Sequence, residues 1–416
     1  MISRLRPLAL AQLAVGGGVA VSGAAPARCL LCCRSVRLLS TARPKAEPAP
    51  ASSPEPIQRP KSRPPLAAPS ATAGRAAPFP LSDPAAGLTD QAQRQPLKHQ
   101  WLPVDRDLAS PGAYLALAKS RLTLLVVATA AAGYAMAPGP VDPLTLAACL
   151  AGTAAVSASA NSVNQLLEMP YDAQMSRTRA RPLVTGRVSP ATAASFAAVS
   201  GIGGVALLAS LASPVSAGIA AANHLLYCAA YTPAKRRTVT NTAIGAVVGA
   251  LPPLIGWSSA TGGSLDVGAL LLGLLMFHWQ FPHFHALSWS LRDDYSRAGY
   301  CMASVLQPAR CRRSAMANSI MFSAVCYCLP LSGVTSWFFL VDILPFNLAL
   351  LYFAAAFYWR GDSNSGRRLF KFTLVNLPIV FVLMLISRTP DSERERAKQD
   401  SARDSGQHHQ FGFWRF

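Results

Sequence analysis

The sequence has little charge for its length. Charged residues make up 14% of its 416 residues and hydrophobic residues 51%, whereas a typical soluble chain is about 25% charged. This shortage argues against an ordinary soluble globular domain and indicates a membrane protein.

Acidic residues are scarcer than basic ones. There are 19 Asp and Glu against 38 Lys and Arg, which gives a formal net charge of +19. Such an excess can indicate nucleic-acid binding. Here, however, the basic residues lie in a leader, in a linker and in short loops between apolar runs. Membrane topology explains that distribution better, so we expect no nucleic-acid partner.

Asp and Glu are absent from the N-terminal segment 1–46, which carries several Ser and seven basic residues: Arg4, Arg6, Arg28, Arg34, Arg37, Arg43 and Lys45. This composition predicts a mitochondrial transit peptide over 1–45. The apolar stretch 8–21 could instead be a secretory core, but the distributed arginines favour the mitochondrion. Residues 46–112 are rich in Pro, Ala and Ser, which predicts a disordered linker.

The nine cysteines form no recognisable disulfide framework. Cys29 and Cys32 have the spacing of a redox or zinc pair, but no second pair completes a metal site. We interpret this spacing as chance.

Long apolar runs dominate the chain from Tyr114 onwards. A membrane-spanning helix needs about 20 apolar residues. Nine segments meet this need: 117–137, 144–167, 191–211, 213–231, 240–258, 267–287, 314–333, 336–358 and 368–387. We therefore predict an all-α, multi-spanning membrane bundle of nine transmembrane helices over 113–388, followed by a charged tail over 389–416.

The loops between these runs alternate in charge. Every second loop carries Lys or Arg, and these basic loops contain the ranges 177–187, 235–237, 292–313 and 360–368. The positive-inside rule places the basic loops and the N-terminus on one side of the membrane. In the mitochondrial inner membrane that side is the matrix, with the C-terminus opposite.

The stretch 161–190 combines acidic and basic residues where an apolar run ends. Asn164, Glu168 and Asp172 are four residues apart, which places them on nearly one face of a helix; Pro170 is expected to break or bend that helix. Arg177 and Arg181 follow. Carboxylates suit Mg²⁺, and Arg pairs with phosphate oxygens. The pattern indicates an amphiphile with a diphosphate headgroup, although polar residues at a helix end can also be merely interfacial.

Two further clusters lie in later loops and helix ends. Lys235 and Arg236 could complete a diphosphate cage, although residues that only set topology look the same. His278, His283 and His285 lie close together among aromatic residues that include Trp279, Phe281 and Phe284. They suggest a flat, apolar, metal-bearing ligand, since imidazole is a common haem-iron ligand. Packing histidines are the alternative. Asp293 and Asp294 could hold a second cation or be interfacial.

Together, these clusters resemble the UbiA-type intramembrane prenyltransferases over about 114–387, and within them the haem-farnesylating branch. The motifs that carry the resemblance run in order: Asn164-x-x-x-Glu168-x-x-x-Asp172, Arg177-Thr-Arg-Ala-Arg181-Pro-Leu, Tyr231-Thr-Pro, Lys235-Arg-Arg-Thr238, Gly249-Ala-Leu-Pro-Pro-Leu-Ile-Gly-Trp257, Trp279-Gln-Phe-Pro-His-Phe284 and Asp294-Tyr-Ser-Arg-Ala-Gly-Tyr-Cys-Met302. The chain departs from the family pattern at Glu168 and Gln165, where Asp is usual. It also has a His-rich segment before Asp293 and Asp294, where the family usually has two spaced Asp residues.

The resemblance implies the substrates and the roles of the residues. Farnesyl diphosphate and haem B would react to give haem O for haem A and cytochrome c oxidase assembly. The implied Mg²⁺ ligands are Asn164, Glu168, Asp172 and Asp294. The implied catalytic residues are Asn164, Glu168, Asp172 and Lys235. The diphosphate would bind Arg177, Arg181, Lys235 and Arg236, and haem would contact Trp279, His283 and His285. The implied partners are the lipid bilayer, a second copy of the chain and a downstream haem A-forming enzyme. A quinone-ring acceptor and a non-enzymatic transporter remain alternatives.

Overall fold

The computed structural model describes residues 110–390 and 392. The predicted transit peptide 1–45, the linker up to residue 109 and the tail from residue 393 lie outside the described residues. Helices make up the described part, which has no β-strand and only an isolated bridge between Thr335 and Arg388.

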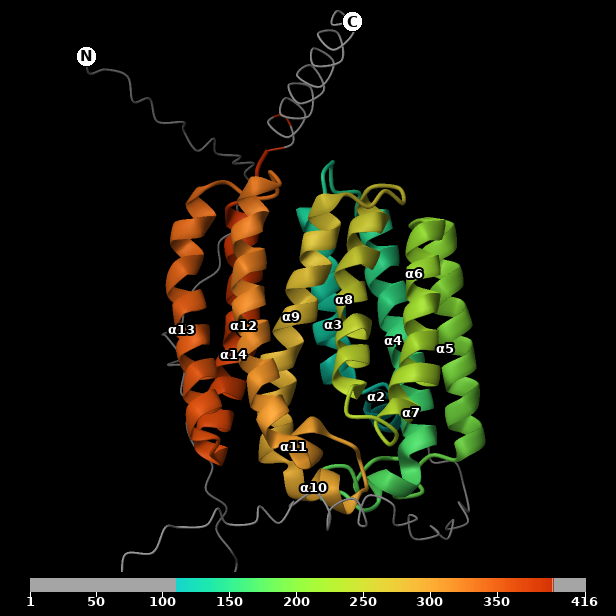
Figure 1. Cartoon of the computed structure of the whole chain (residues 1–416). Coiled ribbons are helices and arrows are strands. Elements are labelled where there is room, and N and C mark those ends of the chain that lie inside the picture. The colour runs from blue at the N-terminus through green and yellow to red at the C-terminus, as the bar shows by residue number, and fades with distance from the viewer. Residues whose placement is uncertain (1–109, 391, 393–416) are drawn as a thin grey trace, which may run out of the picture. The chain divides into compact units, whose positions relative to one another are not determined.

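The helices follow one another closely along the chain (Figure 1). Their bounds are α2 (Pro111–Leu117), α3 (Ser120–Met136), α4 (Pro143–Asp172), α5 (Pro190–Leu211), α6 (Pro214–Leu225), the π-helix η1 (Leu226–Tyr231), α7 (Thr232–Ala234), α8 (Asn241–Ala260), α9 (Val267–Ser290), α10 (Arg292–Arg297), α11 (Ala303–Leu306), α12 (Pro308–Leu331), α13 (Phe338–Arg360) and α14 (Ser363–Ile386).

The predicted all-α membrane bundle is confirmed, with slightly fewer qualifying spans than the nine predicted. Within the described residues, seven helices are long and apolar enough to cross a membrane, and eight are if the bent pair α2 and α3 counts as one span. The segment predicted over 213–231 is helical but divided, because α6 ends at Leu225 and η1 takes over. Neither piece alone has the length of a span. Together, however, α6, η1 and α7 (Thr232–Ala234) lead from the loop 212–213 at one end of the bundle to the basic loop at the other, so the chain still changes side here (Figure 1).

The long helices pack in an order that differs from their order in the chain. The helix α3 packs on α4 and α8, while α9 contacts α8, α12 and α14. The largest apolar core lies among α8, α9 and α12–α14 and includes Trp257, Phe322 and Phe357. Large apolar side chains also face outward, such as Val199 and Ile202 of α5. Such a surface suits contact with lipid.

Small residues permit the closest helix approach. A Cβ atom at Gly133 of α3 would overlap the carbonyl oxygen of Pro253 in α8, and one at Gly256 of α8 would overlap that of Ala130 in α3. The backbones of α3 and α8 are therefore in close contact, because small residues let two helices approach each other.

The basic loops gather at one end of the bundle, the lower end in Figure 1, together with α2, α7, α10 and α11. The opposite end is formed by the loops 137–142, 212–213, 261–266 and 332–337, which contain no Lys or Arg. This arrangement agrees with the predicted alternation of loop charge and brings the polar clusters together.

Candidate functional site

The helix α4 supplies one polar face at the basic end of the bundle. It continues through Pro170 to Asp172, so the expected break there is absent. Pro170 cannot donate a backbone hydrogen bond of its own, but the turn is kept beyond it, where the Ala173 amide donates to Met169 O at 3.2 Å. Asn164, Glu168 and Asp172 therefore share a face, and all three are buried. Buried carboxylates are costly unless they are paired.

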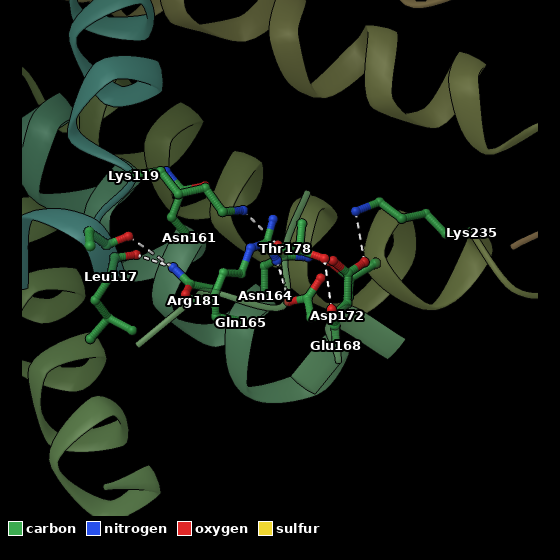
Figure 2. A network of polar contacts seen from close by, with 12 residues as sticks. Leu117, Lys119, Asn161, Asn164, Gln165, Glu168, Asp172, Thr178, Arg181 and Lys235 are labelled. Atoms are coloured by element: carbon green, nitrogen blue, oxygen red, sulfur yellow. Dashed lines mark hydrogen bonds and ion pairs between the residues drawn. The ribbon is translucent and has the colours of Figure 1, made fainter. Parts of the chain in front are cut away.

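Three cations from separate parts of the chain meet this face (Figure 2). Lys235 Nζ donates to Glu168 Oε1 at 2.7 Å, and Arg181 forms an ion pair with Asp172. Lys119 Nζ donates to Asn164 Oδ1 at 2.7 Å. We call these six residues the cation–carboxylate network.

Lys119 was not among the residues expected from the sequence. It lies at the break between α2 and α3, which meet at an angle of 59°. The break frees backbone carbonyl groups that two amides of α4 then bind. Gln165 Nε2 donates to Leu117 O at 2.6 Å, and Asn161 Nδ2 donates to Ala118 O at 3.2 Å. The sequence predicts a single span over 117–137, whereas the structure has a break near its start.

Lys235 follows directly after the π-helix η1 and α7. Its Nζ atom lies 4.6 Å from the centre of the Tyr231 ring. Burial alone lowers the pKa of Lys235, but the adjacent Glu168 carboxylate outweighs burial and holds the pKa well above its usual value. Asn164 Nδ2 donates to Thr232 Oγ1 at 3.2 Å, which fixes this helix end against α4. The adjacent carboxylate therefore favours the charged form of Lys235 in the network.

The remaining diphosphate candidates lie at the edge of the network. Arg236 stacks over the Tyr171 ring at 4.1 Å, and its buried Nε atom has no hydrogen-bond partner among the described residues. Arg177 is exposed, and no hydrogen bond or ion pair joins it to the described part of the chain. Arg181 is thus the arginine of this loop that reaches the carboxylates.

Asp294 on α10 joins the site through a different partner. Its carboxylate accepts a hydrogen bond from Ser176 Oγ at 2.6 Å and pairs with Arg297. The Ser176 hydroxyl lowers the pKa of Asp294 below its usual value. Next along the chain, the Cys301 amide donates to Lys235 O at 2.7 Å. The segment 292–302 therefore covers the two basic loops, and Asp294 contacts the Arg-rich loop rather than the cation–carboxylate network.

The histidines of α9 do not converge on one point. His283 stacks on Trp279, with ring centres 4.5 Å apart and an interplanar angle of 19°. His278 Nδ1 lies 2.8 Å from Asn318 Oδ1. His285 is only 3% exposed, and its Nδ1 atom has no partner among the described residues. Of the residues expected to contact haem, Trp279 and His283 lie together and His285 is apart from them.

The network has the chemistry for a diphosphate and a hard cation. Asn164, Glu168 and Asp172 offer only oxygen donors, as Mg²⁺ prefers. In the described residues, no three His, Cys, Asp or Glu side chains are already grouped as metal ligands. The carboxylates are paired with Lys235 and Arg181 instead, which fits a site whose cations also bind phosphate oxygens.

Comparison with known proteins gives a consistent assignment. The model of the UbiA prenyltransferase family matches residues 126–377. A human protein called protoheme IX farnesyltransferase, mitochondrial, is 46% identical over 280 residues, which cover 67% of this chain and 63% of the human protein. The Arabidopsis thaliana protein of the same name is 36% identical, covering 69% of this chain and 68% of its own length. The chain thus spans somewhat less than two thirds of the human relative.

Solved structures share the fold at low sequence identity. A digeranylgeranylglyceryl phosphate synthase structure aligns with a TM-score of 0.58 at 15% identity, covering 66% of this chain and 97% of that one. The apo structure of a UbiA homologue from Aeropyrum pernix K1 aligns with a TM-score of 0.51 at 17% identity, covering 64% of this chain and 98% of that one. The long family match and these likenesses lead to one conclusion: the chain belongs to the UbiA prenyltransferase family.

Proposed function

We propose that this protein transfers the farnesyl group of farnesyl diphosphate to a vinyl group of haem B, giving haem O and free diphosphate. The observation that carries the proposal is the buried cation–carboxylate network at the end of α4. It supports diphosphate chemistry at a membrane helix end. The names of the relatives support haem B as the acceptor.

The diphosphate binds to Lys119, Arg181 and Lys235, with Arg177 and Arg236 at the edge of the site. Mg²⁺ would be held by Asn164, Glu168 and Asp172. Asp294, which Ser176 holds against the adjacent Arg-rich loop, would supply a further oxygen when the metal binds. When bound, Mg²⁺ supplies positive charge against the departing diphosphate. Lys119, Arg181 and Lys235 also stabilise the departing diphosphate, because negative charge grows on it as the C–O bond breaks.

The reaction breaks the allylic C–O bond, and its electron pair leaves with the diphosphate. The π electrons of the haem vinyl group form the new C–C bond with the farnesyl carbon. Water then adds to the cation beside the pyrrole ring and loses a proton, which gives the hydroxyethylfarnesyl group of haem O. The apolar helices exclude water from the allylic cation until the vinyl group has reacted.

The cellular setting is part of the same proposal. The enzyme lies in the mitochondrial inner membrane with its N-terminus and basic loops in the matrix. It passes haem O to a haem A-forming enzyme of cytochrome c oxidase assembly and forms homo-oligomers. The relatives' names support the mitochondrion, and the one-sided basic loops support the orientation.

A direct assay tests the proposal. Purified protein is incubated with haem B, farnesyl diphosphate and Mg²⁺, and the products are separated and identified by mass. Formation of haem O supports the proposal. If a quinone-ring compound is prenylated and haem B is not, the acceptor is the quinone ring and not haem B. Diphosphate transport without prenyl transfer would make the protein a carrier. Transporters usually break their helices near the membrane midplane, whereas the break between α2 and α3 lies at the basic end, where Figure 1 shows α2.

A further inference from the structure

Thr373 on α14 anchors both rings of the stacked pair on α9. It is fully buried. Its backbone oxygen accepts a hydrogen bond from Trp279 Nε1 at 3.1 Å, and its side-chain Oγ1 lies 3.0 Å from His283 Nδ1. Phe370, one turn earlier on α14, also lies against the imidazole, with ring centres 4.9 Å apart. One threonine thus sets the place of the indole and the imidazole together.

The same hydroxyl decides which imidazole nitrogen carries the proton. Thr373 Oγ1 lies 2.7 Å from the carbonyl oxygen of Phe370. A carbonyl has no proton to give, so the single hydroxyl proton of Thr373 points to Phe370 O. Toward His283, Thr373 Oγ1 can then only accept. The proton therefore lies on His283 Nδ1, and the Nε2 atom carries a free lone pair.

We propose that Thr373 is a positioning residue that holds the His283 imidazole with Nε2 unprotonated, and that this Nε2 atom binds the iron of the haem acceptor. The inference rests on the proposed function, since it concerns the acceptor of that reaction. Imidazoles that bind metal usually donate their other N–H to an oxygen, which fixes both the tautomer and the ring orientation. Thr373 supplies that oxygen.

The other two histidines of the cluster lack this combination. His278 has an oxygen partner in Asn318, but its ring meets Phe277 edge-on, and no stacked aromatic ring faces it within residues 110–390. His285 has no partner for its buried Nδ1 atom among the described residues. The stack on Trp279, together with the Thr373 contact, singles out His283.

The test is a haem B titration of purified full-length protein, followed by the absorption bands of the bound haem. Thr373→Val keeps the shape and the backbone oxygen that binds Trp279 but removes the hydroxyl. Thr373→Ser keeps the hydroxyl and is the matched control. We expect Thr373→Val to weaken haem binding by about tenfold or more, the usual cost of losing such a partner, and to shift the bands. Thr373→Ser should resemble wild type.

His283→Ala should lose the same bands, and added imidazole should restore them. His278→Ala and His285→Ala should keep them. The inference is overturned if Thr373→Val binds haem B with the absorption bands and affinity of the wild type. It is also overturned if the bands are lost in His278→Ala instead of His283→Ala. Farnesyl diphosphate binding, measured on each variant, should stay unchanged and reports that the bundle is intact. Normal haem O formation by His283→Ala would sink this inference alone, whereas no haem O from wild-type protein would sink the proposed function.

Discussion

Lys119 Nζ hydrogen-bonds Asn164 Oδ1 at 2.7 Å and so joins the break between α2 and α3 to the polar face of α4. Within the described part of the chain, Lys119 is the one non-glycine residue with a positive φ, which is 49°. That left-handed conformation is uncommon for residues with a Cβ atom, and such strain tends to cluster at functional sites. The backbone at the break and the ammonium group in the network therefore depend on each other.

Replacing Lys119 by Met keeps most of the side-chain length and removes the charge. We expect a higher KM for farnesyl diphosphate and a lower kcat, because positive charge beside the leaving group is lost. A tenfold loss in kcat/KM would correspond to about 1.4 kcal/mol. Arg121→Met is the matched control, since Arg121 lies two residues away and is exposed. Equal effects of the two substitutions would remove Lys119 from the site.

The carboxylates of α4 should be essential for turnover. Glu168→Gln and Asp172→Asn are each expected to lower kcat by about a hundredfold or more, because the diphosphate and its cation lose their charged partner. Steady-state farnesyl transfer is the measurement. Asp342→Asn, at an exposed position on α13, should be neutral. Ordinary turnover in both α4 variants would exclude these residues as metal ligands.

The contact between Ser176 and Asp294 should stabilise the fold in a pH-dependent way. The pKa of Asp294 is lowered by this hydrogen bond. A lowered carboxylate pKa adds stability above its unfolded value, about 3.9, and that stability is lost as the pH falls through the folded value. Ser176→Ala should therefore cost about 1 kcal/mol of unfolding free energy at neutral pH, and less in acid. Thermal unfolding at both pH values measures this; an equal loss at both would contradict it.

The contact between α3 and α8 should not tolerate a side chain. In Gly256→Val, the new Cβ atom would overlap the carbonyl oxygen of Ala130, so the helices must separate. Overpacking of this kind costs about 1–3 kcal/mol, and more where backbone must move. Gly218→Ala is the control, because nothing lies within 4 Å of its added Cβ atom. Melting temperature should fall in the first variant only.

Epitope tags test the orientation. A tag within 46–112 or at Gly186 should be protected from protease in mitoplasts, and a tag at Gly262 or after residue 390 should be cleaved. The expectation follows from the basic loops, which lie at one end of the bundle and favour the matrix side. The reverse pattern of cleavage would invert the assigned topology.

Several features followed from the sequence because they depend on local chemistry. Apolar runs of spanning length predicted the helical bundle, since a backbone in lipid must satisfy its own hydrogen bonds. The four-residue spacing of Asn164, Glu168 and Asp172 predicted their common face, because that spacing is one helical turn. The alternation of basic loops predicted which helix ends lie together, since each span reverses the side.

The remaining features depend on contacts between distant parts of the chain, which only the tertiary structure decides. Lys119 enters the network because the chain breaks between α2 and α3 and α4 binds the freed carbonyl groups. No local sequence pattern predicts this break. The two-residue spacing of His283 and His285 already predicts that they point to different faces of a helix. It does not say which side chains each ring meets. The helix α14, about 90 residues later, supplies the Thr373 hydroxyl that distinguishes His283. Long-range packing therefore decides the role of each histidine.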